Sequence, residues 1–222
     1  MKHFIGCIFG ATGTGKSHKA RELVKSLLAE KISILIYDPL PDGEWAEDFW
    51  NDGFEKVRNL RGFCKFINEC YSKRIPYLRL VYWPDGSSGL DAQVEFEIVA
   101  GVVRQWHNAL FVIEEAALFC TASKIGENAK SLIQWGRHNG ISQLVITQRP
   151  SNLNINYRGN ATWFRCFRLS DPNDLDWMRY AGLDPKEIES LRPTIKNHWP
   201  SVLKDFSAPL EIPAPPKKRK AG

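Results

Sequence analysis

The feature that most constrains the fold is a glycine-rich run near the start of the chain, Gly10-Ala11-Thr12-Gly13-Thr14-Gly15-Lys16-Ser17. It follows an apolar stretch at 3–9 and precedes a helix-like stretch at 16–30, the context that the pattern G-x-x-x-x-G-K-[ST] requires. Glycines let the backbone turn tightly enough for its N–H groups to converge on phosphate oxygens, and the following helix adds its positive dipole end. The run therefore predicts a strand, a phosphate-binding loop and a helix, with a nucleoside triphosphate as ligand.

The last two side chains of this run have distinct expected roles. Lys16 is expected to reach the β and γ phosphates of ATP, and Ser17 to offer its hydroxyl to Mg²⁺, which prefers hard oxygen ligands. The alternative is a glycine-rich turn with an accidental Lys-Ser pair. The order of strand, loop and helix favours the phosphate site.

Apolar runs alternate with helix-period segments along most of the chain, which predicts an α/β fold with a mainly parallel sheet and helices on both faces. Ligands of such sheets gather at the carboxyl ends of the strands. Two short helices at 173–181 and 185–191, with Asp171 and Asp184 as N-caps, are expected to close the domain. The expected strands are 3–9, 33–37, 77–83, 109–113, 143–147 and 162–169, and the expected longer helices are 16–30, 61–74, 91–108 and 128–139.

Length and composition favour one domain with a tail. The 222 residues suit a single ATPase domain at 1–200, followed by a proline-rich basic tail at 201–222. The sequence has no apolar run of about 18 residues and no signal pattern, so we expect a soluble, intracellular chain without a transmembrane segment. The five cysteines are scattered and form no zinc pattern with histidine, which indicates reduced thiols. A net charge of +5 is compatible with a polyanionic partner but does not establish one.

A second motif follows the apolar strand at 109–113, which ends in the pair Glu114-Glu115 and resembles the Walker B motif of P-loop ATPases that carry an extra glutamate. Glu114 is expected to hold the Mg²⁺ hydration shell, and Glu115 to orient and deprotonate the attacking water. Aspartate is usual at the first position. Because glutamate is one methylene longer, we expect Glu114 to contact the metal through water. The alternative is a strand that ends in two solvated acids.

A third motif, Thr147-Gln148-Arg149-Pro150-Ser151, follows the strand at 143–147. Together with the paired glutamates and the segment at 136–141, it resembles the HerA/FtsK superfamily of DNA-translocating ATPases, over roughly residues 3–170. A lone P-loop domain with these motifs and little else is similar to the genome-packaging ATPases of icosahedral viruses with internal membranes, the tectivirus type in particular. The resemblance implies a RecA-like P-loop fold of the additional-strand, catalytic-glutamate type.

The resemblance also implies two further catalytic roles. Gln148 becomes the polar sensor beside the γ-phosphate, and Arg137 the leading candidate for an arginine finger inserted into a neighbouring subunit's site. The alternative for Arg137 is a solvated arginine at a helix end. Arg149 and Arg165 are weaker finger candidates, since Arg149 can brace the turn at Pro150 and Arg165 can pair with a carboxylate at the sheet edge.

The sequence offers few candidates for contacts with DNA. A translocase needs cationic loops that face its channel, and Lys124, in the loop at 121–126, lies where nucleotide-driven movement could reach a pore. Its alternative is an exposed loop lysine. The basic run Lys217, Lys218, Arg219 and Lys220 could tether DNA, but it also resembles a nuclear-localisation signal or a solubilising end. Trp45 and Trp50 are interpreted as packing residues and not as residues that stack on bases.

The expected function is an ATP- and Mg²⁺-dependent motor that drives double-stranded DNA into a preformed viral shell. The expected assembly is a homo-oligomeric ring, most simply a hexamer, because an arginine supplied by a neighbour makes a head-to-tail interface. Capsid vertex proteins would then be partners, and the host cytoplasm and the virion the locations. Three alternatives stay open: a cellular HerA/FtsK-type DNA-pumping motor, a P-loop small-molecule kinase, and a nucleotide-gated structural protein without hydrolysis.

Overall fold

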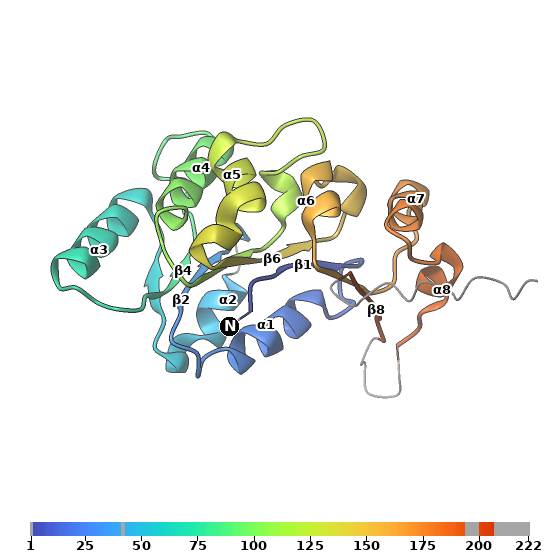
Figure 1. Ribbon diagram of the computed structural model, residues 1–222, viewed down its shortest axis with the longest axis horizontal. Coiled ribbons are helices and arrows are strands. Elements are labelled where there is room, and N and C mark those ends of the chain that lie inside the picture. The colour runs from blue at the N-terminus through green and yellow to red at the C-terminus, as the bar shows by residue number, and fades with distance from the viewer. Residues whose placement is uncertain (1, 41–42, 194–199, 207–222) are drawn as a thin grey trace, which may run out of the picture.

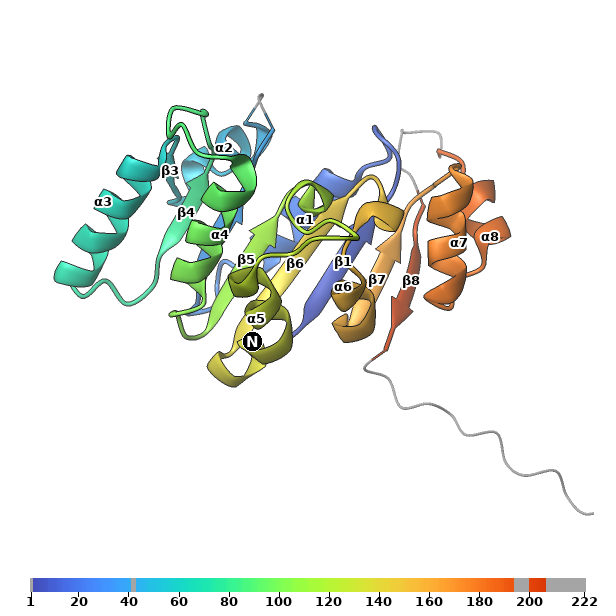
Figure 2. The same cartoon turned by 90° about the horizontal axis from the view of Figure 1, so that it is seen from above.

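The computed structural model describes residues 2–40, 43–193 and 200–206, which build an eight-stranded sheet with helices on both faces (Figure 1). The spatial order of the strands is β3-β4-β2-β5-β6-β1-β7-β8, and it can be followed along the row of arrows in Figure 2. All pairings are parallel except that of β7 with β8, which is antiparallel. The strands are β1 Ile5–Phe9, β2 Ser33–Tyr37, β3 Glu55–Val57, β4 Arg79–Tyr82, β5 Ala109–Ile113, β6 Ile141–Thr147, β7 Trp163–Cys166 and β8 Val202–Asp205.

The helices form two layers. In Figure 1, α1 and α2 lie below the sheet and α3 to α6 above it, while α7 and α8 lie at the end beyond β8. The helices are α1 Lys16–Ser26, α2 Glu44–Asp48, α3 Leu60–Ser72, α4 Ala92–Val103, α5 Glu127–Trp135, α6 Ile155–Asn160, α7 Pro172–Tyr180 and α8 Pro185–Ser190. The fold class expected from the sequence, a RecA-like P-loop α/β domain with a mainly parallel sheet, is confirmed.

Alternating side chains of the central strands supply two separate apolar cores. In β2, Ile34 and Ile36 join the core that contains α1 and α2, whereas Leu35 and Tyr37 join the core under α3 to α5. Every residue of β1, β2, β5 and β6 is buried. Strands buried on both faces are rich in apolar residues, and these apolar runs predicted the four strands. In β6 the run is interrupted by the buried polar residues Ser142 and Gln143.

Four helices and strands were not predicted: the helices α2 and α6 and the edge strands β3 and β8. β8 pairs with β7, so the sheet continues past residue 200, where we expected the ATPase domain to end. Several helices also end earlier than expected. α1 ends at Ser26, and the last part of the helix expected at 128–139 is a 3-10 turn, Gly136–Asn139. Asp171 and Asp184 cap α7 and α8 as predicted.

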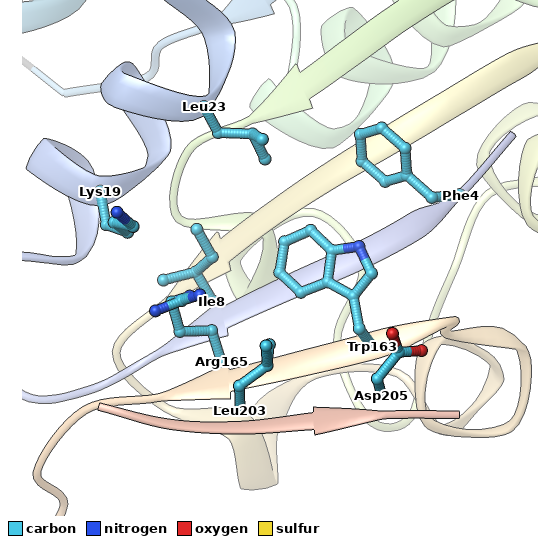
Figure 3. Close-up of a pocket in the computed structure, with 8 residues that line it drawn as sticks. All are labelled: Phe4, Ile8, Lys19, Leu23, Trp163, Arg165, Leu203 and Asp205. Carbon is cyan, nitrogen blue, oxygen red and sulfur yellow. The ribbon is translucent and has the colours of Figure 1, made fainter. Parts of the chain in front are cut away.

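On the face that carries α1, a groove runs between α1 and the strands β1, β7 and β8 (Figure 3). The indole of Trp163 stands in this groove and packs over the backbone of β1, where Gly6 leaves room for the ring. Phe4 lies against the same ring at a centroid distance of 5.9 Å. Among the described residues, no helix is both long and apolar enough to cross a bilayer.

Candidate active site

Three strands at the centre of the sheet bring the three motifs together. β6 pairs with β5 on one side and with β1 on the other, and all three run parallel. The glycine-rich loop follows β1, the paired glutamates follow β5, and Gln148 follows β6. Residues far apart in the sequence therefore meet at the carboxyl edge of the sheet.

The glycine-rich loop is wound tightly between β1 and α1. Gly13 and Gly15 have left-handed φ angles of 74° and 91°, a conformation that favours glycine. Lys16 is 6% exposed, and its Nζ donates to the carbonyl oxygen of Ala11 at 3.0 Å. Burial lowers the pKa of this lysine, whereas the nearby carboxylates of Glu114 and Glu115 raise it. The ammonium group of Lys16 thus lies inside the loop, hydrogen-bonded to the Ala11 carbonyl and near the carboxylates of Glu114 and Glu115.

Glu114 is buried directly beside the loop. Its Oε1 accepts a hydrogen bond from Ser17 Oγ at 3.3 Å, and its Oε2 accepts one from Trp45 Nε1 at 2.7 Å. The pKa of Glu114 is raised to about 7, mainly by burial. The carboxylates of Asp38 and Glu115 act in the same direction, whereas the hydrogen bond from Trp45 and the charge of Lys16 oppose them. The two residues expected to serve the metal, Ser17 and Glu114, are therefore in contact. A hydroxyl and a carboxylate are oxygen donors of the kind that suits Mg²⁺.

Glu115 turns away from the line of β5. Its backbone is left-handed, with φ 47° and ψ 48°, a conformation that is uncommon for residues other than glycine and that clusters at functional sites. Its Oε1 accepts hydrogen bonds from Thr147 Oγ1 at 2.7 Å and from the backbone N–H of Gln148 at 3.2 Å. The unusual backbone thus directs the carboxylate toward the end of β6.

Gln148 connects the end of β6 with the glycine-rich loop. Its side-chain oxygen accepts a hydrogen bond from Thr12 Oγ1 at 2.6 Å. The amide group expected to sense the γ-phosphate is therefore attached to the loop expected to bind the phosphates.

Arg137 does not join this cluster. It lies in the 3-10 turn Gly136–Asn139, immediately before β6 begins at Ile141, and hence at the amino edge of the sheet. The pKa of His3, which precedes β1, is lowered mainly by burial and second by the positive charge of Arg137. Within one chain, the arginine is at the opposite edge of the sheet from the loop.

The other candidate cations have local partners or lie outside the described residues. Arg149 forms ion pairs with Asp171 at 3.0 Å and Asp174 at 2.9 Å, which fastens the Pro150 turn to α7. Arg165 donates to Ser201 Oγ at 3.0 Å. Lys124 is exposed and closes a turn through its backbone N–H, which donates to Thr121 Oγ1 at 3.0 Å. The basic run at 217–220 is outside the described residues.

Three residues at this site were given no role in the sequence analysis: Asp38 was not considered, Trp45 was interpreted as a packing residue, and Thr147 was named only as part of the third motif. Asp38 directly follows β2, is completely buried, and accepts from the backbone N–H of Trp45 at 3.3 Å. An acid immediately after an apolar strand was the available signal for Asp38. Trp45 carried no such signal, because its partner Glu114 is 69 positions away.

Comparisons with known proteins agree with the fold and with the resemblance seen in the motifs. The family model described as "Helicase HerA, central domain" matches residues 2–84. No curated protein matches the chain by sequence. The chain resembles HerA/FtsK-type ATPases, among them ATPases of viral genome packaging, as the motifs indicated.

Solved structures share the architecture at low sequence identity. The genome packaging NTPase B204 from Sulfolobus turreted icosahedral virus 2, in complex with sulfate, is 17% identical, with a TM-score of 0.69 over 93% of both chains. B204, the DNA-packaging ATPase from Sulfolobus turreted icosahedral virus, is 22% identical, with a TM-score of 0.65 over 86% of this chain and 90% of that one. VirB4 of Thermoanaerobacter pseudethanolicus is 11% identical, with a TM-score of 0.54 over 83% of this chain and 82% of that one. At these identities the likeness establishes the fold.

Proposed function

We propose that this chain is a Mg²⁺-dependent ATPase that moves double-stranded DNA, and that it packages viral DNA into a preformed capsid. The observation that carries the proposal is the position of Glu115. An unusual backbone conformation and hydrogen bonds from Thr147 and Gln148 hold its carboxylate at the end of β6, and the side chain of Gln148 in turn contacts Thr12 of the glycine-rich loop. A motor needs such a base beside its phosphate loop, whereas a kinase must keep water from attacking.

The residues of the loop and its neighbours divide the work of hydrolysis among them. The backbone N–H groups of 10–15 and the ammonium group of Lys16 bind and orient the triphosphate. Ser17 and Glu114 hold Mg²⁺, which neutralises charge on the phosphates when bound. Glu115 takes a proton from the attacking water, and Gln148 senses the γ-phosphate from the end of β6. This division of roles is supported by three contacts within the cluster: Gln148 with Thr12, Ser17 with Glu114, and Gln148 with Glu115.

Arg137 completes the site of a neighbouring subunit. Because it lies at the amino edge of the sheet, it cannot serve the loop of its own chain without a large movement. A guanidinium supplied in trans makes a head-to-tail interface, and such interfaces close into rings when the rotation permits. The assembly is a ring of identical subunits, most simply a hexamer.

The choice of DNA packaging rests on likeness to relatives. Two of the similar structures are described as a genome packaging NTPase and a DNA-packaging ATPase, and B204 in complex with ATP-γ-S matches with a TM-score of 0.68. Under this proposal the chain works in the host cytoplasm and at the capsid vertex, with capsid vertex proteins as partners. Lys124 and the basic run at 217–220 are the proposed DNA contacts. The match to the HerA central domain keeps a cellular DNA-pumping motor as the second candidate.

Phosphate release measured with and without double-stranded DNA tests the proposal. The wild-type chain should hydrolyse ATP faster when DNA is present, and Glu115→Gln should bind ATP but lose roughly 10²- to 10⁴-fold in turnover, the usual contribution of a general base. A turnover in Glu115→Gln equal to wild type removes the proposed base. Phosphate transfer to a small acceptor indicates a kinase, and tight ATP binding without hydrolysis indicates a structural role. DNA uptake by purified empty capsids separates packaging from a cellular motor.

A further inference from the structure

The carboxylate of Glu114 is shared between the phosphate loop and a residue from outside all three motifs. Oε1 accepts from Ser17 and Oε2 accepts from the indole N–H of Trp45, at 3.3 Å and 2.7 Å. Glu114 is 2% exposed and Trp45 is 1% exposed. The shorter of the two hydrogen bonds to this acid is therefore the one from a buried tryptophan on α2.

The indole is fixed in place by contacts on several sides. The backbone N–H of Trp45 donates to the buried carboxylate of Asp38 at 3.3 Å, which ties α2 to the end of β2. Arg21 of α1 pairs with Asp48 of α2 at 2.7 Å, and Phe49 stacks on the indole at a centroid distance of 5.8 Å. The donor thus has a fixed position that does not depend on Glu114.

A fixed donor matters because glutamate stands where aspartate is usual. The longer side chain has one more rotatable bond, so more directions are open to its carboxylate. An indole N–H can only donate, so it occupies one carboxylate oxygen and leaves the other directed at Ser17. Groups that hydrogen-bond to a metal-binding residue orient it, and their loss typically costs about 10- to 100-fold in metal affinity.

We propose that Trp45 is a positioning residue for the metal-binding carboxylate, with its indole N–H holding Oε2 of Glu114 so that Oε1 and Ser17 Oγ together face the cation. The inference rests on the proposed function, because it assumes that Ser17 and Glu114 serve Mg²⁺. It assigns to α2, a helix absent from the three motifs, a direct part in the nucleotide site. A purely structural Trp45 would fill the space between α1 and α2 and would leave the cation unaffected.

The substitution Trp45→Phe separates these two roles, since it keeps an aromatic ring and removes the donor. Trp106→Phe is the matched control, because Trp106 is also buried and donates its indole N–H, in this case to Tyr71 at 3.1 Å, near the amino edge of the sheet. Calorimetric titration of Mg²⁺ into the complex with a non-hydrolysable ATP analogue should show an affinity about 10- to 100-fold lower for Trp45→Phe. The affinity for the analogue in EDTA should stay at the wild-type value, and Trp106→Phe should match wild type in both measurements.

A double-mutant cycle with Glu114→Asp adds a readout that a packing defect would not change. The shorter carboxylate should not reach the indole, so Trp45→Phe should have little further effect on Mg²⁺ affinity in that background. Equal losses in both backgrounds, or wild-type Mg²⁺ affinity in Trp45→Phe, would overturn the inference.

A measurement on the wild-type chain covers the case in which Trp45→Phe does not fold. In ¹H–¹⁵N spectra, the indole resonance of Trp45 should shift when Mg²⁺ is added to the nucleotide complex, while that of Trp106 should not. If the chain binds Mg²⁺ and nucleotide but the Trp45 resonance does not move, the positioning role is contradicted and the proposed function is not. A wild-type chain that binds neither nucleotide nor Mg²⁺ contradicts the proposed function instead.

Discussion

Thr147 Oγ1 donates a 2.7 Å hydrogen bond to Oε1 of Glu115, and so links the end of β6 to the acid that follows β5. Thr147 is completely buried, and its hydroxyl also accepts from the backbone N–H of Arg149 at 3.2 Å. Both ends of this bond are therefore restrained: the threonine by burial and a second hydrogen bond, the glutamate by its left-handed backbone. The direction of the proposed base depends on this contact.

Replacing Thr147 with valine should slow turnover without weakening nucleotide binding. The change removes the hydroxyl at nearly constant size, so the carboxylate of Glu115 loses a bond that orients it, and small misplacements of catalytic groups are costly. We expect kcat to fall by about 10-fold or more, with little change in KM, as measured by phosphate release. Thr147→Ser retains the hydroxyl and is the control. A kcat in Thr147→Val equal to that of the serine variant would show that the bond does not orient the base.

Arg137→Ala should abolish turnover while leaving ATP binding intact, with a loss of about 10³-fold or more if the arginine acts as a finger. Because the residue is proposed to act in trans, mixing has a specific outcome. Arg137→Ala supplies intact loops and Glu115→Gln supplies intact fingers, so mixed assemblies of the two inactive variants should regain part of the activity. The assay is phosphate release over a range of mixing ratios. Wild-type turnover in Arg137→Ala alone, or no recovery in mixtures that demonstrably co-assemble, would contradict the role.

The central sheet could be predicted because its signals are local. β1, β2, β5 and β6 are fully buried and consist mostly of apolar residues, although β6 also buries Ser142, Gln143 and Thr147. The glycine-rich loop has a fixed pattern of its own. The residues that follow three of these strands were then expected to meet at one edge, and they do.

The elements that were missed depend on distant contacts. β3 has three residues and β8 is a short edge strand that is largely exposed, so neither shows an apolar run. α2 has five residues and α6 has six, too few for a clear helical period. α2 is held by Asp38 and by the ion pair between Arg21 and Asp48. The role of Trp45 depends on a partner 69 positions away, which no local pattern reveals. Sequence reasoning therefore located the loop and the acids but not the residues that orient them.

The five cysteines should differ sharply in reactivity. Cys64 is exposed, whereas Cys7, Cys70, Cys120 and Cys166 are buried. Burial raises the pKa of the Cys120 thiol to about 12, and the thiolate is the reactive form. A disulfide-exchange reagent at pH 8 should therefore titrate one thiol per folded chain rapidly and all five after unfolding in denaturant. Rapid labelling of Cys120 in the folded chain would contradict the packing of the core.

Adding a single methyl group at Gly6 should destabilise the fold through Trp163. A Cβ at Gly6 would lie 2.0 Å from Cζ2 of the Trp163 ring, far inside contact distance, so the indole would have to move away from the backbone of β1, within the groove beside α1 (Figure 3). Overpacking of this kind typically costs about 1–3 kcal/mol, and we expect Gly6→Ala to lower the free energy of unfolding in urea by that amount.

Gly159→Ala is the matched control, because a Cβ there meets nothing within 4 Å and the position lies in α6. The helix propensity of alanine should leave that variant unchanged or stabilise it by up to about 1 kcal/mol. Trp163→Leu should reduce the cost of Gly6→Ala, since the smaller side chain gives the methyl group room, and an unchanged cost in that background would show that the strain arises elsewhere in β1.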